Sequence, residues 1–287
     1  MKKTFLKNKK NIQFLIIGLG LIGGSVAKRL SKNGFEVLAI DKNKSHLNNA
    51  KKSKIIVGSS EKTNRAKKLF VIVALPPKIL LNNFDKYLDF FHKAEFITDC
   101  TSVKGSLLNK IRKNKLESKF ILSHPIAGSE KSGFLNSNED LFKDKISIIS
   151  KHKGLAIPTI QKCKELWFEL GSKTHNLDPK LHDKILSLTS HLPHVVAFSL
   201  ISLFSKRKPS EYRKFIGGGL KDFTRIAESD PVMWENIFSL NKKNILRDIT
   251  EIEKEINQIK SFILQDNGSK LEEHLKKIKK TKESFNR

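Results

Sequence analysis

The chain has 287 residues, of which 38% are hydrophobic and 29% are charged, and its formal net charge at pH 7 is +26. These values are typical of a folded, soluble protein with one large domain or two ordinary ones. Only eight of the 55 basic residues are arginine, whereas recognition of nucleic acids relies on arginine and on stacked aromatic side chains. The charge therefore does not indicate a nucleic-acid partner, although a positive field attracts anionic ligands.

Residues 1–10 form a basic tail, and the apolar stretch that follows imitates a secretory signal sequence. Four glycines between positions 18 and 24 suit a strand and a tight turn instead, because glycine destabilises a helix. The two cysteines have no metal-type spacing. The longest apolar run, Leu188 to Phe204, is interrupted by two histidines and a proline. We therefore expect a cytoplasmic protein with no signal peptide, no membrane span and no metal.

Residues 11–177 alternate short apolar runs with lysine-rich amphipathic segments, which is the rhythm of βαβ units. This alternation predicts a Rossmann-type α/β fold, with a doubly wound, mostly parallel sheet covered on both faces. The expected strands are Phe14 to Ile17, Glu36 to Ile40, Ile55 to Val57, Leu69 to Ala74, Glu95 to Thr98, Phe120 to Ser123 and Ile146 to Ile149.

Residues 178–287 carry long helical patterns without a strand signal, so we expect a second, all-helical domain whose apolar faces pack on each other or on another subunit. The charged tail after Lys276 is expected to be poorly ordered. The predicted helices are Lys180 to Phe204, Gly219 to Glu228, Pro231 to Lys260 and Ser269 to Lys280.

The first strand runs into a GxGxxG turn that opens a helix, which is the context of a dinucleotide-binding fingerprint. Its glycines permit the tight turn, the approach of the pyrophosphate and close helix packing, and the phosphates then lie at a helix N-terminus. Asp41 ends the second strand, where a carboxylate accepts hydrogen bonds from the ribose hydroxyls and repels a 2′-phosphate. These features predict NAD as the cofactor, although Lys42 and Lys44 weaken the discrimination against NADP. The fingerprint residues are Gly18, Leu19, Gly20, Leu21, Ile22 and Gly23.

His124 follows the strand that ends at Ser123, so it is expected at the carboxyl edge of the sheet, where such folds bind ligands. A histidine there can accept a proton from a substrate hydroxyl while hydride leaves the same carbon. The alternative is that His124 only caps the sheet edge by hydrogen bonding. Ser102 follows another strand and either caps a helix or hydrogen-bonds His124, the nicotinamide amide or the substrate.

His191 and His194 are three residues apart, which places both on nearly one face of a helix. A third ligand at matching spacing is missing from the sequence pattern, so hydrogen-bonded core histidines or anion-facing groups are favoured over a metal site.

A run of three glycines ending at Gly219 permits close approach of a ligand, and the helix after it carries Arg225. Arginine can hold a carboxylate in a bidentate pair. The alternative is a flexible hinge followed by a surface arginine. Trp234, in the next helix, is expected to be a core residue or a pocket wall.

Together these segments closely resemble the prephenate and arogenate dehydrogenases of tyrosine biosynthesis. Five motifs in order carry the resemblance: the fingerprint from Gly18, Ser102 to Lys104, His124 to Glu130, Ser190 to His194, and Gly217 to Trp234. The resemblance implies oxidative decarboxylation, in which a cyclohexadienyl alcohol gives hydride to NAD and the ring carboxylate leaves as CO2. It also implies a homodimer formed through the helical domain. We expect no chorismate mutase region before the chain and no regulatory domain after it.

The resemblance also assigns roles to residues. The residue matching His124 binds and helps deprotonate the ring hydroxyl, the one matching Ser102 helps to position it, and the one matching Arg225 holds a substrate carboxylate. The residues that line the substrate pocket match His191, His194, Glu130 and Trp234.

Three alternatives remain. Arogenate differs from prephenate by an amino group in place of a keto group, and the sequence favours prephenate only modestly. A β-hydroxyacid dehydrogenase shares the domain order but uses a catalytic lysine in its helical domain. An NAD-sensing regulator that binds nucleic acid would account for the charge but leaves His124 and Arg225 without a task. Feedback inhibition by tyrosine stays open.

Overall fold

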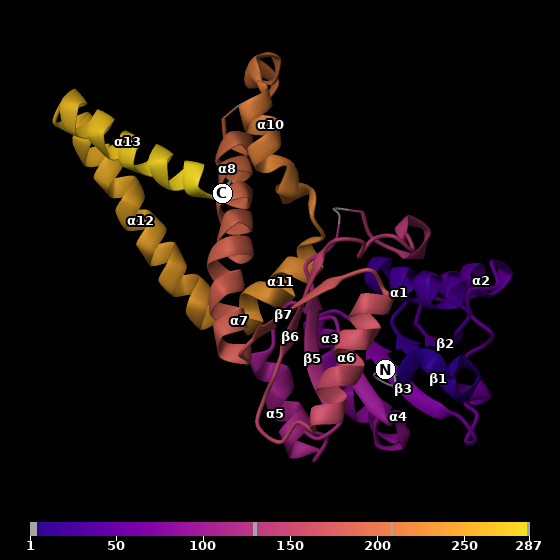
Figure 1. The fold of residues 1–287 in the computed structure, drawn as a ribbon. Helices are drawn as coiled ribbons and strands as arrows, with labels where there is room; N and C mark the ends of the chain where they lie inside the picture. The colour runs from indigo at the N-terminus through magenta and orange to yellow at the C-terminus, as the bar shows by residue number, and fades with distance from the viewer. Residues whose placement is uncertain (1–4, 129–130, 208, 286–287) are drawn as a thin grey trace. The chain divides into compact units, whose positions relative to one another are not determined.

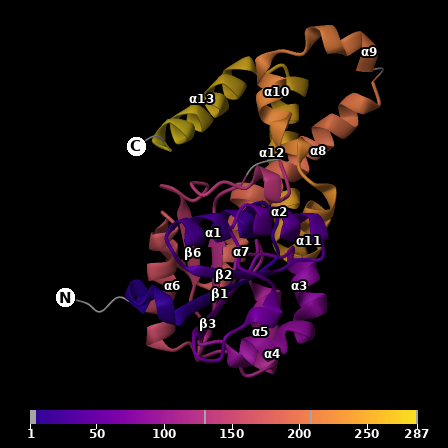
Figure 2. The same ribbon diagram turned by 90° about the vertical axis from the view of Figure 1, so that its right-hand side faces the viewer.

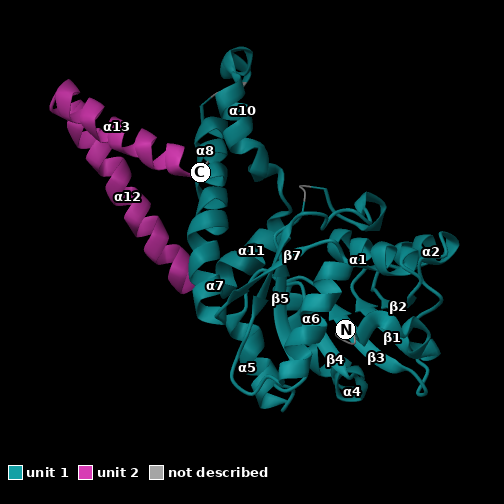
Figure 3. Cartoon of the chain, in the orientation of Figure 1, with its two compact units in different colours: residues 1–241 teal, residues 242–287 magenta. Residues whose placement is uncertain are grey.

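The computed structural model describes residues 5–128, 131–207 and 209–285. Contacts within the chain divide it into two compact units, residues 1–241 and residues 242–287 (Figure 3). All helices and strands from the first strand to Asn241 therefore belong to one compact unit. The predicted domain boundary near residue 177 lies within this unit, between the last strand and the helix after it, and it stays a prediction.

The first unit is built on a seven-stranded sheet with the order β2-β1-β3-β4-β5-β6-β7 (Figure 1). The first five strands are parallel, β6 is antiparallel to β5, and β7 is parallel to β6. The predicted mostly parallel sheet is therefore confirmed. The strands are β1 (Ile12–Ile17), β2 (Glu36–Ile40), β3 (Lys68–Val73), β4 (Phe96–Asp99), β5 (Phe120–Pro125), β6 (Ile146–Ser150) and β7 (Lys173–Leu177).

Alternate residues of the buried strands enter two separate cores, because successive side chains of a strand point to opposite faces. Phe14 and Ile16 pack with α1 (Leu21–Lys32), α2 (Lys44–Lys52) and α6 (Ile157–Glu169). Leu15 and Ile17 pack with α3 (Pro77–Asn83), α4 (Leu88–Lys93) and α5 (Gly105–Lys113). Helices thus cover both faces of the sheet (Figure 2).

Two predictions about strands are wrong. Residues 55–57 form no strand, and the chain there makes an isolated bridge between Leu38 and Gly58 instead. The strand β7 was missed because its sequence, KTHNL, has a single aliphatic residue and most of its side chains are exposed or half-buried. It lies at the end of the sheet, where one neighbour suffices and an apolar pattern is not required.

The rest of the first unit is helical: α7 (Pro179–Leu186), a π-helical turn (Ser187–His191), α8 (Leu192–Ser205), α9 (Pro209–Tyr212), α10 (Gly218–Thr224) and α11 (Pro231–Leu240). The predicted single helix from Pro231 to Lys260 is wrong, because the chain breaks at Asn241. Asn241 leaves the helical conformation, with φ −105° and ψ 21°. Its side-chain amide donates to the carbonyl oxygen of Asp183 at 2.7 Å, which fixes the break.

The π-helical turn joins α7 and α8 into one continuous stretch from Pro179 to Ser205. By length and composition alone, this stretch is long and apolar enough to cross a membrane. The expectation that no segment reaches this length is therefore corrected. The stretch from Pro179 to Ser205 contains three buried polar residues that hydrogen-bond within the first unit, His182, Asp183 and His191.

The second unit consists of α12 (Lys242–Leu264) and α13 (Gly268–Ser284), joined by a short turn in which Asn267 caps α13 by accepting from the amide of Lys270. The expectation of a poorly ordered tail after Lys276 is wrong, because α13 continues to Ser284. Ion pairs from Glu272 and Glu273 to the lysines four residues later support this helix.

Candidate active site

The strand order brings the predicted site residues to one edge of the sheet. Strands β2, β1, β3, β4 and β5 are parallel neighbours, so their carboxyl ends lie side by side. Asp41 follows β2, the fingerprint turn follows β1, Asp99 ends β4 and His124 is the last residue but one of β5. A dinucleotide that lies along this edge with its adenosine at Asp41 therefore reaches towards His124 with its other end.

The fingerprint turn has the shape that a dinucleotide requires. Gly18 has φ +97°, a conformation that favours glycine, and a Cβ at Gly23 would lie 1.8 Å from the carbonyl oxygen of Gly18. A Cβ at Gly20 would meet no atom within 4 Å, so the space over the start of α1 is open. The turn and the helix N-terminus fit a pyrophosphate.

Asp41 is held by the backbone around it. Its Oδ2 accepts from the amide of Leu19 at 2.5 Å and its Oδ1 accepts from the amide of Asn43 at 2.7 Å. The imidazole Nδ1 of His46 lies 3.7 Å from Oδ2. The carboxylate is thus fixed between the fingerprint turn and α2, where it can face a ribose.

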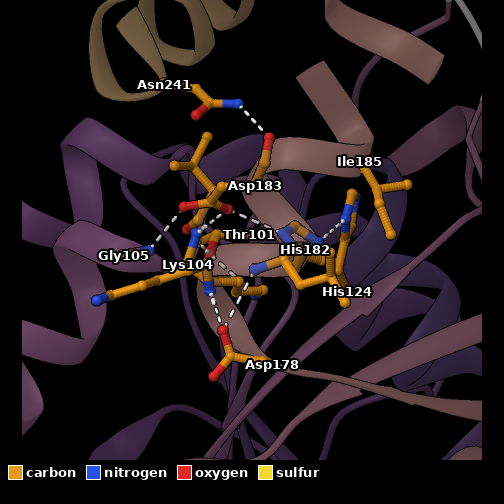
Figure 4. A network of polar contacts seen from close by, with 12 residues as sticks. Thr101, Lys104, Gly105, His124, Asp178, His182, Asp183, Ile185 and Asn241 are labelled. Carbon is orange, nitrogen blue, oxygen red and sulfur yellow. Dashed lines mark hydrogen bonds and ion pairs between the residues drawn. The ribbon is translucent and has the colours of Figure 1, made fainter. Parts of the chain in front are cut away.

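His124 begins a chain of hydrogen bonds that leads into α7 (Figure 4). Its Nδ1 lies 2.9 Å from Nε2 of His182, and Nδ1 of His182 lies 2.9 Å from Oδ1 of Asp183. The carboxylate of Asp183 also accepts from the backbone amides of Lys104 and Gly105, each at 2.9 Å. The chain therefore connects the end of β5 to the start of α5.

The order of donors along this chain assigns the tautomer of His124. The Asp183 carboxylate is an acceptor, so Nδ1 of His182 carries the proton and its Nε2 is an acceptor. Nδ1 of His124 must then donate to His182, which leaves Nε2 of His124 with a free lone pair. This is the state of a general base.

The environment keeps both imidazoles neutral. Burial holds the pKa of His124 well below its usual value, and the neighbouring His182, Lys104 and His191 act in the same direction. Burial also lowers the pKa of His182, against its hydrogen bond to Asp183, which raises it. His124 nevertheless stays partly exposed, so a substrate can reach it.

Sequence reasoning missed His182, Asp183 and Asn241. His182 and Asp183 carried no positional signal, because β7 runs opposite to β1–β5 and its carboxyl end points to the other edge of the sheet, from which α7 returns. Asn241 carried no signal, since its partners are distant in sequence.

A second cluster gathers the predicted pocket residues around Trp234. The ring of His194 stacks on the indole with centroids 3.6 Å apart, and the ring of His191 meets it edge-on at 6.0 Å. Asn241 links this cluster to the base, because its amide donates to Nδ1 of His191 at 3.1 Å and to the Asp183 carbonyl. The two histidines three residues apart therefore contact the same indole, as their spacing predicts.

Arg225 begins the short 3-10 helix Arg225–Glu228 that follows α10. Arg225 is exposed and lies close to His194. Burial lowers the pKa of the His194 imidazole, the hydrogen bond to the Ser190 carbonyl raises it, and the charge of Arg225 lowers it. Gly219 lies in α10, and a Cβ there would meet no atom within 4 Å. The space at Gly219 is thus open, and chain packing alone does not require glycine there.

Two further predicted residues are Ser102 and Glu130. Ser102 lies partly exposed between β4 and α5, and within the described residues its hydroxyl makes no hydrogen bond to His124. Glu130 lies outside the described residues. In residues 5–128, 131–207 and 209–285, no group of three or more metal-ligating side chains is arranged to hold a metal ion.

Comparison with known proteins gives two matches that together span most of the chain. Residues 26–176 match the model of the prephenate dehydrogenase nucleotide-binding domain, and residues 178–277 match that of the prephenate dehydrogenase dimerization domain. The chain belongs to the prephenate dehydrogenase family. The predicted family and the predicted order of a nucleotide-binding domain and a helical domain are confirmed.

Individual relatives agree. The chain is 31% identical to the prephenate dehydrogenase of Lactococcus lactis, over 95% of this chain and 77% of that protein. It is 27% identical to the cyclohexadienyl dehydrogenase of Zymomonas mobilis, over 93% of this chain and 94% of that protein. Among solved structures, the prephenate dehydrogenase of Aquifex aeolicus in complex with hydroxyphenyl propionate and NAD+ is 33% identical, with a TM-score of 0.84 over 95% of this chain and 98% of that one.

Proposed function

We propose that this dehydrogenase oxidises and decarboxylates prephenate to 4-hydroxyphenylpyruvate with NAD, in tyrosine biosynthesis. The observation that carries the proposal is the free Nε2 of His124, fixed by His182 and Asp183 at the sheet edge that holds the fingerprint. The prephenate dehydrogenases among its relatives support the choice of substrate.

The chemistry divides between cofactor and protein. Bound NAD supplies a hydride acceptor for the alcohol carbon of the ring. Nε2 of His124 accepts the hydroxyl proton, and the bond from the ring to its carboxylate breaks as CO2 leaves and the ring becomes aromatic. The phenolate oxygen then takes the proton back from His124, which gives the phenol of the product. The positive charge that His124 gains lies one imidazole away from the Asp183 carboxylate, which stabilises it. We assign to Ser102 the positioning of the substrate hydroxyl.

The second cluster is proposed to bind the substrate side chain. Arg225 holds a carboxylate, and His194 and Trp234 form the wall. The guanidinium of Arg225 is a hydrogen-bond donor, and the indole Nε1 of Trp234 is buried without a hydrogen-bond partner among the described residues. Donors suit the keto oxygen of prephenate, whereas the ammonium group of arogenate needs acceptors. His191, Gly219 and Glu130 are proposed to complete the pocket.

We propose NAD rather than NADP because the fixed Asp41 carboxylate would repel a 2′-phosphate. The relative bound to NAD+ supports this choice.

We also propose a homodimer in the cytoplasm. The matched dimerization model covers residues 178–277, and large apolar side chains are exposed there, among them Leu188 at 60%, Phe215 at 84% and Val232 at 64%. Burial of such side chains against a second copy of the chain would remove apolar surface from water. Both cysteines are free thiols, as in a reducing compartment.

Product analysis tests the activity. The protein is incubated with prephenate and NAD, and NADH, CO2 and 4-hydroxyphenylpyruvate are measured, with a 3-hydroxyacid as the competing substrate. Equimolar formation of the three products supports the proposal. NADH formed from the 3-hydroxyacid but not from prephenate would assign the protein to the β-hydroxyacid dehydrogenases instead.

A further inference from the structure

A fully buried ion pair lies beneath the proposed base. Nζ of Lys104 is 2.6 Å from Oδ2 of Asp99, and both side chains are completely shielded from solvent. Charged side chains are rarely buried to this degree, because both ions lose their hydration, and apolar replacements often serve stability equally well. Stability alone therefore gives no reason for this pair, and the mechanism above does not use it.

Both members of the ion pair hydrogen-bond to the backbone of the residue before His124. Nζ of Lys104 donates to the carbonyl oxygen of Ser123 at 2.5 Å, and Oδ1 of Asp99 accepts from the amide of Ser123 at 3.1 Å. Thr101 completes the group, because its hydroxyl and its amide both donate to Asp99. Both polar groups of the Ser123 backbone are thus fixed by opposite charges.

Lys104 also reaches the other end of the hydrogen-bonded chain. Its backbone amide donates to Asp183, which orients His182 (Figure 4). Lys104 therefore supports His124 in two ways: its side chain binds the backbone of Ser123, and its main-chain amide binds the aspartate that orients His182.

The charge of the pair acts on His124 as well. Among the described elements, the titratable or charged groups that act on this imidazole are His182 on α7, His191 on the π-helical turn and Lys104 just before α5. Asp183 and Asp99 are the partners of His182 and Lys104. Burial is the largest influence on the pKa of His124, and the cation of Lys104 lowers that pKa further.

We propose that Asp99 and Lys104 together are positioning residues for the base: they fix the backbone that carries His124, and the balance of their charges sets how readily its imidazole takes a proton. The inference rests on the proposed function only in its treatment of His124 as the base.

The test uses the sign of the charge change. In the full-length protein without substrate, the titration of His124 is followed by NMR of labelled histidine and assigned by its loss in His124→Asn. Lys104→Met leaves Asp99 unpaired and should raise the midpoint by about one pH unit. Asp99→Asn leaves the cation unpaired and should not raise it. The double variant, which restores the balance, should return the midpoint towards that of the wild type.

A matched control and a second readout separate this role from a structural one. Lys162→Met breaks the Lys162–Glu95 pair at the opposite end of β4 and should leave the midpoint unchanged. The double variant keeps no unpaired buried charge and should fold, yet it should lose roughly tenfold in kcat with an unchanged KM for NAD, because Ser123 is no longer held.

The inference is overturned if Lys104→Met leaves the midpoint where it was, if the single variants shift it in the same direction, or if the folded double variant keeps full kcat. Should Lys104→Met not fold, the Asp99→Asn titration and the kcat of the double variant decide. The titration needs no substrate, so a protein that ignores prephenate but shows the expected shifts refutes the proposed substrate and not this inference.

Discussion

Nδ1 of His124 lies 2.9 Å from Nε2 of His182, which comes from a helix 58 residues further along the chain. The contact fixes which nitrogen of His124 is free, because Asp183 determines the tautomer of His182. The base is therefore prepared jointly by the sheet and by the first helix after it.

Replacing His124 by asparagine should lower kcat by roughly two to four orders of magnitude, the usual effect of losing an acid–base group. His175, exposed on β7, provides the control, since His175→Asn should leave kcat unchanged. Steady-state rates of NADH formation measure both. A kcat near that of the wild type in His124→Asn would show that another group accepts the proton.

The His182→Gln variant should lower kcat by roughly one to two orders of magnitude, because His124 then loses the partner that fixes its tautomer and orientation. The KM for NAD should not change, as the fingerprint turn is untouched. An unaltered kcat would mean that His124 orients itself without the chain to Asp183.

The Arg225→Ala variant should chiefly raise the KM for prephenate, by roughly tenfold or more, because a charge-assisted hydrogen bond to a carboxylate is lost. Arg112→Ala, at the exposed end of α5, is the matched control. If the KM for prephenate in Arg225→Ala equals that of the control, Arg225 does not hold the substrate.

Changing Asp41 to asparagine should raise the KM for NAD and lower the KM for NADP, since the side chain keeps an acceptor for Leu19 but loses the charge that repels a 2′-phosphate. Asp140→Asn, which breaks a surface pair with Arg29, controls for loss of charge elsewhere. A cofactor preference identical to that of the wild type would remove Asp41 from this role.

The free energy of unfolding should decrease as the pH is lowered because of His182, which is completely buried. Burial lowers its folded-state pKa, whereas the unfolded chain takes up the proton at about pH 6.5. The contribution is thus fully present above about pH 6.5 and decreases as the pH falls towards the folded-state pKa, with a slope of up to about 1.4 kcal/mol per pH unit. Urea unfolding at fixed protein concentration measures the slope, which should be smaller in His182→Gln. Equal slopes would contradict a neutral buried His182.

Local sequence pattern was enough to predict what depends on neighbours in the chain. The alternation of apolar runs predicted the parallel sheet, and the fingerprint with Asp41 predicted the nucleotide-binding edge. His124 was found because its position after a strand implies its position at the edge.

The parts that sequence did not predict depend on contacts between distant residues. His182 and Asp183 meet His124 and Lys104 only because α7 returns to the sheet edge. The helix break at Asn241 also depends on a contact between distant residues, because the side chain of Asn241 donates to the carbonyl oxygen of Asp183. The strand β7 is stabilised by pairing with β6, and its polar sequence does not predict this pairing.

The most direct measurement is kcat/KM for prephenate and for arogenate, each with NAD and with NADP, in one preparation. The account predicts the highest value for prephenate with NAD, and a large loss of that value in His124→Asn. A higher value for arogenate, or for any pair with NADP, would contradict the proposed substrate or cofactor, and turnover of neither substrate would contradict the proposed activity altogether.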